Sequence, residues 1–185
     1  MAWIKFIEET EATGKLKEYY DHVKRRRGKI ANILKVQSLN PDALRAHLDL
    51  YLALMFGKSG LTRIQREIIA TVVSVINNCD YCTTHHGEAL LRLTKNAELV
   101  GQIKRDFKKA NLTQKDHAML KYAVKLTRNP SELHREDIEH LRHVGFDDAD
   151  ILNVNLITSY FNFVNRIALG LGVEFGEEEA KGYKY

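Results

Sequence analysis

The feature that most constrains the fold of this chain is helical periodicity along nearly its whole length. Apolar residues recur every three or four positions, whereas the apolar–polar alternation typical of a strand is almost absent. In PDALRAHLDLYLALMFG, for example, one helix face carries Leu44, Leu48, Tyr51, Leu52 and Met55. We therefore predict an all-α fold.

Residues that begin and end helices divide this pattern into segments. Thr62 and Gln65 have the spacing of a capping box, Thr113 precedes another helix, and Asn77-Asn78 interrupts the pattern. ANILKVQSLN indicates a less regular connector. The expected helices are Lys15–Arg27, Pro41–Gly57, Thr62 to about Ile76, Asp80–Leu93, Glu98–Lys108, Gln114–Thr127, His134–His143 and Asp148–Leu171.

The domain organisation follows from length and composition. A chain of 185 residues is long enough to bury the core of one ordinary domain, and no boundary rich in Pro, Gly or Ser divides it. We expect a single domain over 1–185, with a catalytic motif at 61–93, a C-terminal helical part at 112–172 and a polar tail at 174–185 that drapes over the surface or frays. The apolar helix faces predict a homo-oligomer that assembles through them.

Charge and hydropathy argue against nucleic-acid and membrane partners. The net charge is only +4, and the basic run KRRRGK is best interpreted as the last turn of a helix that Gly28 caps. The longest apolar run, IIATVVSVI, has nine residues, whereas a membrane-spanning helix needs about 20. The opening MAWIKFIEETEATG turns acidic early and does not resemble a signal peptide. Together these observations predict a cytoplasmic protein.

The stretch CDYCTTHH holds both cysteines of the chain. On a helix, Cys82 and His86 lie one turn apart on the same face, and Cys79 lies about two turns before His86. A helix N-terminus favours a thiolate, and C-x-x-C spacing lets two sulfurs reach disulfide distance. We interpret the pair as a redox centre, and His85, about a quarter turn away, as structural.

Glu67 precedes the apolar run IIATVV on the helix before this centre. Two interpretations stay open from the residues alone. The carboxylate is either exposed and paired with Arg63 or Arg66 at the surface, or buried where it relays a proton together with His86.

Glu67, Cys79, Cys82 and His86 within LTRIQREIIATVVSVINNCDYCTTHH resemble the E-x(11)-C-x-x-C-x-x-x-H signature of the alkylhydroperoxidase D-like branch of the carboxymuconolactone decarboxylase superfamily. The segments ANILKVQSLNPDAL and KLTRNPSELHREDIEHLRHVGFDDADILNVNLITSYFNFVNRIALGLGVEF are similar in order and character to the longer peroxidase-related members. The resemblance covers most of the chain. It implies a helical bundle of the alkylhydroperoxidase D-like type that forms oligomers.

The resemblance also implies a thiol peroxidase, an oxidoreductase that uses a peroxide as acceptor. Cys82 would attack the peroxide, Cys79 would close the disulfide, and Glu67 with His86 would relay the proton. A dithiol such as a dihydrolipoyl or thioredoxin-like partner would supply the electrons, with no cofactor or metal. The sequence departs from well-studied members at Tyr81, where they have histidine directly before the second cysteine.

Other functions remain as alternatives. A decarboxylase-like or other small-molecule activity is possible on the same fold. A redox-sensing or zinc-binding module is the alternative outside enzymes, in which Cys79, Cys82 and His86 with His85 or Glu67 hold Zn²⁺. No second C-x-x-C or H-x-x-x-H supplies the distant ligands of a usual structural zinc site.

The remaining polar and aromatic candidates are assigned to packing. In FNFVNRIALGLG we interpret Asn162, Asn165 and Arg166 as polar groups satisfied between helices rather than as pocket residues. The same stretch supplies core or subunit-interface residues, namely Phe161, Phe163, Val164, Ile167 and Leu171. The scattered histidines, mostly on polar faces and not forming a site, are His22, His47, His117, His134, His140 and His143.

Overall fold

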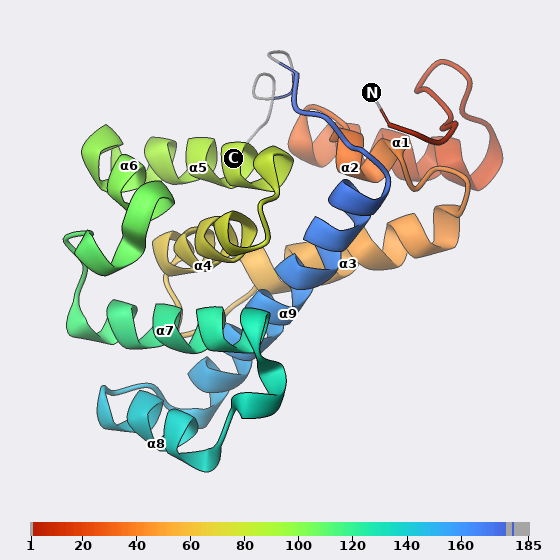
Figure 1. Ribbon diagram of the computed structural model, residues 1–185. Helices are drawn as coiled ribbons and strands as arrows, with labels where there is room; N and C mark the ends of the chain where they lie inside the picture. Colours follow the sequence, from red (N-terminus) through yellow and green to blue (C-terminus); the bar gives the residue numbers. More distant parts are fainter. Residues whose placement is uncertain (1, 177–178, 180–185) are drawn as a thin grey trace.

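The structure is a computed structural model that describes residues 2–176 and 179. Over these residues the fold is all-α and contains no strand, as the periodicity predicts (Figure 1). The α-helices are α1 (Gly14–Arg27), α2 (Asn32–Lys35), α3 (Pro41–Phe56), α4 (Arg63–Ile76), α5 (Asp80–Thr94), α6 (Ala97–Asp106), α7 (Gln114–Arg128), α8 (Arg135–His143) and α9 (Asp148–Gly170). Two 3₁₀ turns join them, η1 (Phe107–Lys109) and η2 (Pro130–Glu132).

The helix boundaries lie close to the predicted ones, with two differences. The connector after α1 contains the short helix α2, and the segment expected as one helix over 98–108 changes to the 3₁₀ turn η1 near its end. Most of the predicted polar tail, 177–178 and 180–185, lies outside the described residues.

Side-chain caps account for several of the boundaries. Thr62 Oγ1 accepts a hydrogen bond from the Gln65 amide at 3.2 Å, and Gln65 Oε1 accepts one from the Thr62 amide at 2.9 Å, so the predicted capping box is confirmed. Thr113 Oγ1 accepts from the Asp116 amide at 3.1 Å. Gly28 ends α1 in the left-handed region at φ 80°, so the KRRRGK run does end a helix.

Helix α4 is the central element, in contact with α3, α5, α6, α7 and α9. Its apolar run is therefore buried on all sides, and two hydroxyl groups within it need partners. Thr71 donates to the Glu67 carbonyl at 2.8 Å and Ser74 donates to the Ala70 carbonyl at 2.7 Å. No helix in the described part of the chain is both long and apolar enough to cross a membrane.

The core consists of two apolar clusters. The larger surrounds α4 and includes α5, α7 and α9, whereas the smaller joins α1, α2 and α3. Tyr51 and Ile33 pack against both clusters. Figure 1 shows α1 to α3 beside the upper part of α9 and the start of α5. The seam between the two clusters therefore lies next to the C-x-x-C segment.

Candidate active site

The two cysteines lie at the beginning of α5, as the spacing predicts. Cys79 is the N-cap residue and Cys82 is in the first turn. The turn before them depends on Asn78, whose φ of 53° is left-handed, and on the Cys79 amide, which donates to the Ser74 carbonyl at 2.9 Å. Both cysteines are free thiols and 1% exposed. The sulfurs are thus held at the end of α4 in a buried, reduced pair.

Contact between the two sulfurs shifts the pKa values of the two thiols in opposite directions. The Cys82 thiol lowers the pKa of Cys79 by donating to its sulfur, with help from the Cys82 backbone amide and the Asn165 side chain, whereas burial and Asp80 oppose this. The same contact with Cys79, together with burial, raises the pKa of Cys82. Of the two thiols, Cys79 is therefore the one that ionises first, and Cys82 keeps its proton.

Glu67 reaches this site from the second turn of α4. Its side chain is fully buried, and Oε2 lies 2.7 Å from Nδ1 of His86 on α5. Oε1 lies 2.5 Å from Nη2 of Arg63, as an ion pair that is off-axis for a hydrogen bond. Of the two interpretations of Glu67, the structure therefore supports the buried one. Because Nδ1 of His86 faces Glu67, Nε2 points away from it.

The arginines of α4 differ in their roles. Arg63 donates to the Met55 carbonyl at 2.8 Å and lies 4.0 Å from the centroid of the Phe56 ring, which fixes its guanidinium beside Glu67. Arg66 is buried and donates to the backbone carbonyls of Leu61, Leu54 and Gly57. The suggested surface pairing of Glu67 with either arginine is therefore wrong, because Arg63 meets the carboxylate inside the protein.

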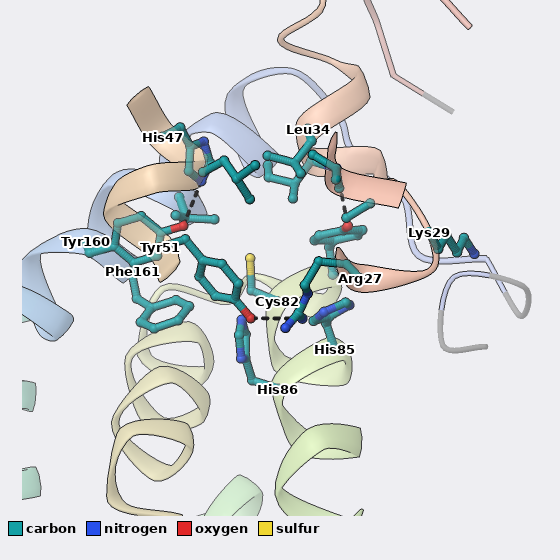
Figure 2. A pocket seen from close by; sticks show the side chains of 16 residues that line it. Arg27, Lys29, Leu34, His47, Tyr51, Cys82, His85, His86, Tyr160 and Phe161 are labelled. Atoms are coloured by element: carbon teal, nitrogen blue, oxygen red, sulfur yellow. Dashed lines mark hydrogen bonds between the residues drawn. The ribbon is translucent and has the colours of Figure 1, made fainter. Parts of the chain in front are cut away.

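A pocket opens at the seam between the two clusters, in front of Cys82 (Figure 2). We call it the inner pocket. Figure 2 shows the Cys82 sulfur and the rings of His85, His86, Tyr51 and Phe161 around one space. Most of its wall is apolar, with further residues from α1 to α3 and α9: Val23, Arg27, Lys29, Ala31, Ile33, Leu34, His47, Leu48, Tyr81, Tyr160 and Val164. The pocket can therefore hold a small organic molecule against Cys82.

Two hydrogen-bonded pairs of side chains place polar atoms in this wall. The Tyr160 hydroxyl lies 2.7 Å from Nε2 of His47, and the Tyr51 hydroxyl accepts from Nη2 of Arg27 at 3.4 Å (Figure 2). Burial raises the pKa of Tyr51 and Tyr160, so both remain phenols at neutral pH. The assignment of His47 to a polar face is wrong, because helix α3 turns it inward onto α9.

His47 makes the stability of the fold sensitive to acid. Burial lowers its pKa from 6.5 to about 4, so between these values the unfolded chain binds a proton that the folded chain does not. We expect the free energy of unfolding to fall as the pH is lowered from about 6.5 to about 4, and His47 alone to account for about 3 kcal/mol of this loss. Urea unfolding across this range measures the effect. A His47→Phe variant with an equally steep pH dependence would contradict the assignment.

His85 also belongs to the inner pocket, although the sequence suggested a structural role. Its Nδ1 is inaccessible to solvent, and burial, with nearby His86 and Arg27, lowers the pKa of His85 to about 3. The ring stacks on Tyr81, with centroids 6.1 Å apart and an angle of 17° between planes. His85 is therefore a neutral base beside the pocket at neutral pH.

Tyr81, between the two cysteines, points toward the C-terminal segment. Its hydroxyl donates to Oε1 of Glu179 at 2.5 Å and accepts from the Ile33 amide at 3.3 Å. Glu179 is buried and also accepts from the Asn32 amide at 2.9 Å. The tyrosine that stands in place of the family histidine therefore ties α5 to α2 and to the C-terminal segment.

Cys79 lines a second and more open depression, which we call the outer groove. Its wall includes Trp3, Asp80, Leu169 and Phe175. Cys79 does not line the inner pocket, and Cys82 does not line the outer groove. The two cysteines thus line different spaces.

The described residues contain no group of three or more histidine, cysteine, aspartate or glutamate side chains placed to hold a metal ion. Among the residues suggested as zinc ligands, His86 directs its Nδ1 at the Glu67 carboxylate. The geometry therefore gives the zinc alternative no support.

The site contains residues that sequence reasoning did not find. The sequence placed Tyr51 in an apolar stripe and Arg27 in the last turn of a helix, and it gave Tyr160 no role. The sequence did place Leu48 and Tyr51 on one face of the same helix, but this spacing is equally typical of an ordinary core. Only the packing of α3 against α9 places these residues around Cys82.

Comparisons with known proteins agree with this fold. The carboxymuconolactone decarboxylase family model matches residues 41–105, which contain α3, α4, α5 and the cysteine pair. A search of curated proteins gave no significant match.

Several solved structures resemble the chain over most of its length. An uncharacterised peroxidase-related protein from Silicibacter sp. TM1040 is 34% identical, with a TM-score of 0.83 over 89% of this chain and 86% of that chain. A peroxidase-related protein from Ralstonia eutropha JMP134, described as an alkylhydroperoxidase AhpD core, is 28% identical, with a TM-score of 0.88 over 97% of this chain and 94% of that chain.

A third structure, the debrominase Bmp8 in complex with 2,3,4-tribromopyrrole, is 18% identical, with a TM-score of 0.80 over 95% of this chain and 92% of that chain. At this identity the likeness shows the fold alone. The match at 34% identity covers nearly the whole of both chains and includes the segment that the family model also matches. The chain therefore belongs to the alkylhydroperoxidase D-like, carboxymuconolactone decarboxylase superfamily.

Proposed function

We propose that the protein is a thiol-dependent peroxidase of the alkylhydroperoxidase type. One observation carries the proposal: two reduced cysteine sulfurs in contact, one of which lines an apolar pocket together with a histidine bound to a buried glutamate. The pocket supplies a place for an organic hydroperoxide, and the pair supplies two electrons. Family membership and the peroxidase-related neighbours make an enzyme the natural expectation.

In the first step the Cys82 sulfur attacks the hydroperoxide in the inner pocket. An S–O bond forms as the O–O bond breaks, so that the sulfur is oxidised to a sulfenic acid and the peroxide leaves as an alkoxide. Because Cys82 keeps its proton in the reduced pair, this proton must leave as the sulfur attacks. His86, oriented by Glu67, would take it and deliver it to the alkoxide, which leaves as the alcohol.

In the second step the Cys79 thiolate attacks the sulfenic acid. A disulfide forms and hydroxide leaves, which takes up a proton to become water. The lowered pKa of Cys79 supports this role, because it makes the attacking sulfur easier to ionise. The division of roles between the sulfurs thus follows the direction of their pKa shifts.

A dithiol, dihydrolipoyl or thioredoxin-like, would return the pair to its reduced form. Thiol–disulfide exchange needs a thiolate to attack one sulfur while the other leaves. Cys79 lines the more open outer groove, so attack on Cys79 with Cys82 as the leaving group would let reductant and peroxide approach from different sides. The second thiol of the reductant then closes its own disulfide.

The assembly and location of the protein are further proposals. Helix α9 presents apolar side chains to solvent, with Leu152 at 58%, Leu156 at 39% and Phe163 at 48% exposure. A homo-oligomer that assembles through this face would bury them. Free cysteines as the reduced form suit the cytoplasm.

Thiol titration before and after peroxide tests the function. One equivalent of an organic hydroperoxide should consume both thiols of the reduced protein and yield one molecule of alcohol and an intramolecular disulfide. Excess dithiol should then restore two thiols and sustain turnover. Thiols that resist peroxide would exclude the peroxidase. A disulfide that forms once but is not turned over by any dithiol would instead favour the redox-sensing module.

A further inference from the structure

A network of side-chain amides lies beside the cysteine pair, partly buried at Asn77 and Asn162 and fully buried at Asn165. It joins the end of α4 to α9 through Asn77, Asn162 and Asn165. Asn165 is 0% exposed and lines neither the inner pocket nor the outer groove. The proposed peroxidase reaction does not use this network.

The hydrogen bonds of the network allow only one orientation of the Asn165 amide. Nδ2 of Asn77 donates to Oδ1 of Asn162 at 3.0 Å and to Oδ1 of Asn165 at 2.9 Å. Ser74 gives its only proton to the Ala70 carbonyl, so its oxygen can only accept, and it does so from Nδ2 of Asn165 at 3.1 Å. The carbonyl oxygen of Asn165 must therefore face Asn77 and its NH₂ group must face Ser74.

The NH₂ group has two hydrogens, and Ser74 uses one of them. The backbone amide of Cys79 donates a hydrogen bond to the carbonyl of the same Ser74, so the cysteine pair lies directly beside the Asn165 NH₂ group. Asn165 contacts both sulfurs, and its amide favours the ionised form of each, lowering the pKa of Cys79 and opposing the rise in the pKa of Cys82.

From this geometry we infer that Asn165 is a dedicated thiolate donor: its side-chain N–H, fixed by Asn77 and Ser74, stabilises negative charge on the Cys79–Cys82 pair. The inference rests on the proposed function for its purpose, because a resolving thiolate is needed there. It does not rest on peroxidase activity for its test. A hydrogen bond to a buried charge is stronger than one between neutral groups.

The thiolate absorbance near 240 nm, measured against pH without any peroxide, tests the inference. The double variant Cys79→Ser/Cys82→Ser supplies the tyrosine background. Loss of the donor in Asn165→Ala should raise the apparent pKa of the first thiol ionisation by about one unit or more. The other titratable groups near the cysteine pair are the same in the wild type and in Asn165→Ala: Asp80, Tyr81, His85 and His86.

Asn162→Ala is the matched control. It removes another amide of the same network, which donates to Thr127 at 3.0 Å and accepts from Asn77 but is not among the groups that shift either thiol. We expect it to leave the thiol pKa within a few tenths of a unit of the wild type. An equal rise in both variants, or no rise in Asn165→Ala, would overturn the assignment and leave Asn165 a packing residue.

If Asn165→Ala does not fold, the isosteric pair Asn165→Asp and Asn162→Asp replaces it. Asn165→Asp keeps the acceptor for Asn77 but turns an oxygen toward the sulfurs, so its thiol pKa should rise well above that of Asn162→Asp. Equal values would contradict the inference. A protein that lacks peroxidase activity but shows the shift would retain the thiolate donor and lose only the proposed function.

Discussion

Replacement of Cys82 by serine should abolish peroxide consumption, with a loss of at least about a thousandfold. A hydroxyl is a far weaker nucleophile than a thiol, and Cys82 is the sulfur that lines the inner pocket beside His86. The measurement is steady-state hydroperoxide consumption with excess dithiol. Because Cys79 and Cys82 are the only cysteines in the chain, Cys79 is the only thiol left in this variant, and it does not line the inner pocket.

Cys79→Ser is the matched variant, since it removes the other sulfur from the same turn. It should reduce one equivalent of peroxide and then stop at the Cys82 sulfenic acid, which dimedone traps and mass spectrometry detects. Removal of the Cys79 thiolate should also make Cys82 easier to ionise, because its contact with Cys79 is the first cause of the raised pKa of Cys82. If Cys82→Ser traps a sulfenic acid on Cys79, the two roles are reversed.

Replacement of Glu67 by glutamine should impair both catalysis and stability. Glutamine removes the negative charge and replaces one carboxylate oxygen with an NH₂ group, so it can no longer offer an acceptor to both Arg63 and Nδ1 of His86. Loss of one partner from a buried ion pair costs about 3 kcal/mol or more, which urea unfolding at pH 7 would measure. The peroxide reaction should slow by about a hundredfold, since His86 is then no longer fixed for proton transfer.

Glu18→Gln is the control, because Glu18 is exposed on α1 and lines neither the inner pocket nor the outer groove. Its free energy of unfolding should stay within about 0.5 kcal/mol of the wild type. A Glu67→Gln protein with unchanged stability would mean that the carboxylate is not an energetic part of the Arg63–Glu67–His86 contact. Unchanged peroxide kinetics in a stable Glu67→Gln protein would remove Glu67 from the proton relay.

The sequence alone was enough to predict the helices and the local part of the site. Several helices begin or end through contacts between residues only a few positions apart, as at Thr62 with Gln65, at Thr113 and at Gly28. Such contacts can be predicted from the local sequence. The same holds for Cys79 and Cys82, because a three-residue spacing at a helix start lets the two sulfurs reach each other within one turn. The identification of the site as a cysteine pair at a helix N-terminus depended on nothing more.

The tertiary structure decided everything that depends on the angle at which helices meet. Glu67 and His86 are nineteen positions apart, and the packing of α4 on α5 brings them to 2.7 Å. His47 and Tyr160 are 113 positions apart, and the packing of α3 on α9 places both in the wall of the pocket. The donating orientation of Asn165 on α9 likewise comes from Ser74 on α4 and from Asn77 just after it. Helix propensity and caps depend on residues close together in the chain. Crossing angles depend on how many side chains from two helices fit together at once, and the periodicity of a single sequence does not contain that information.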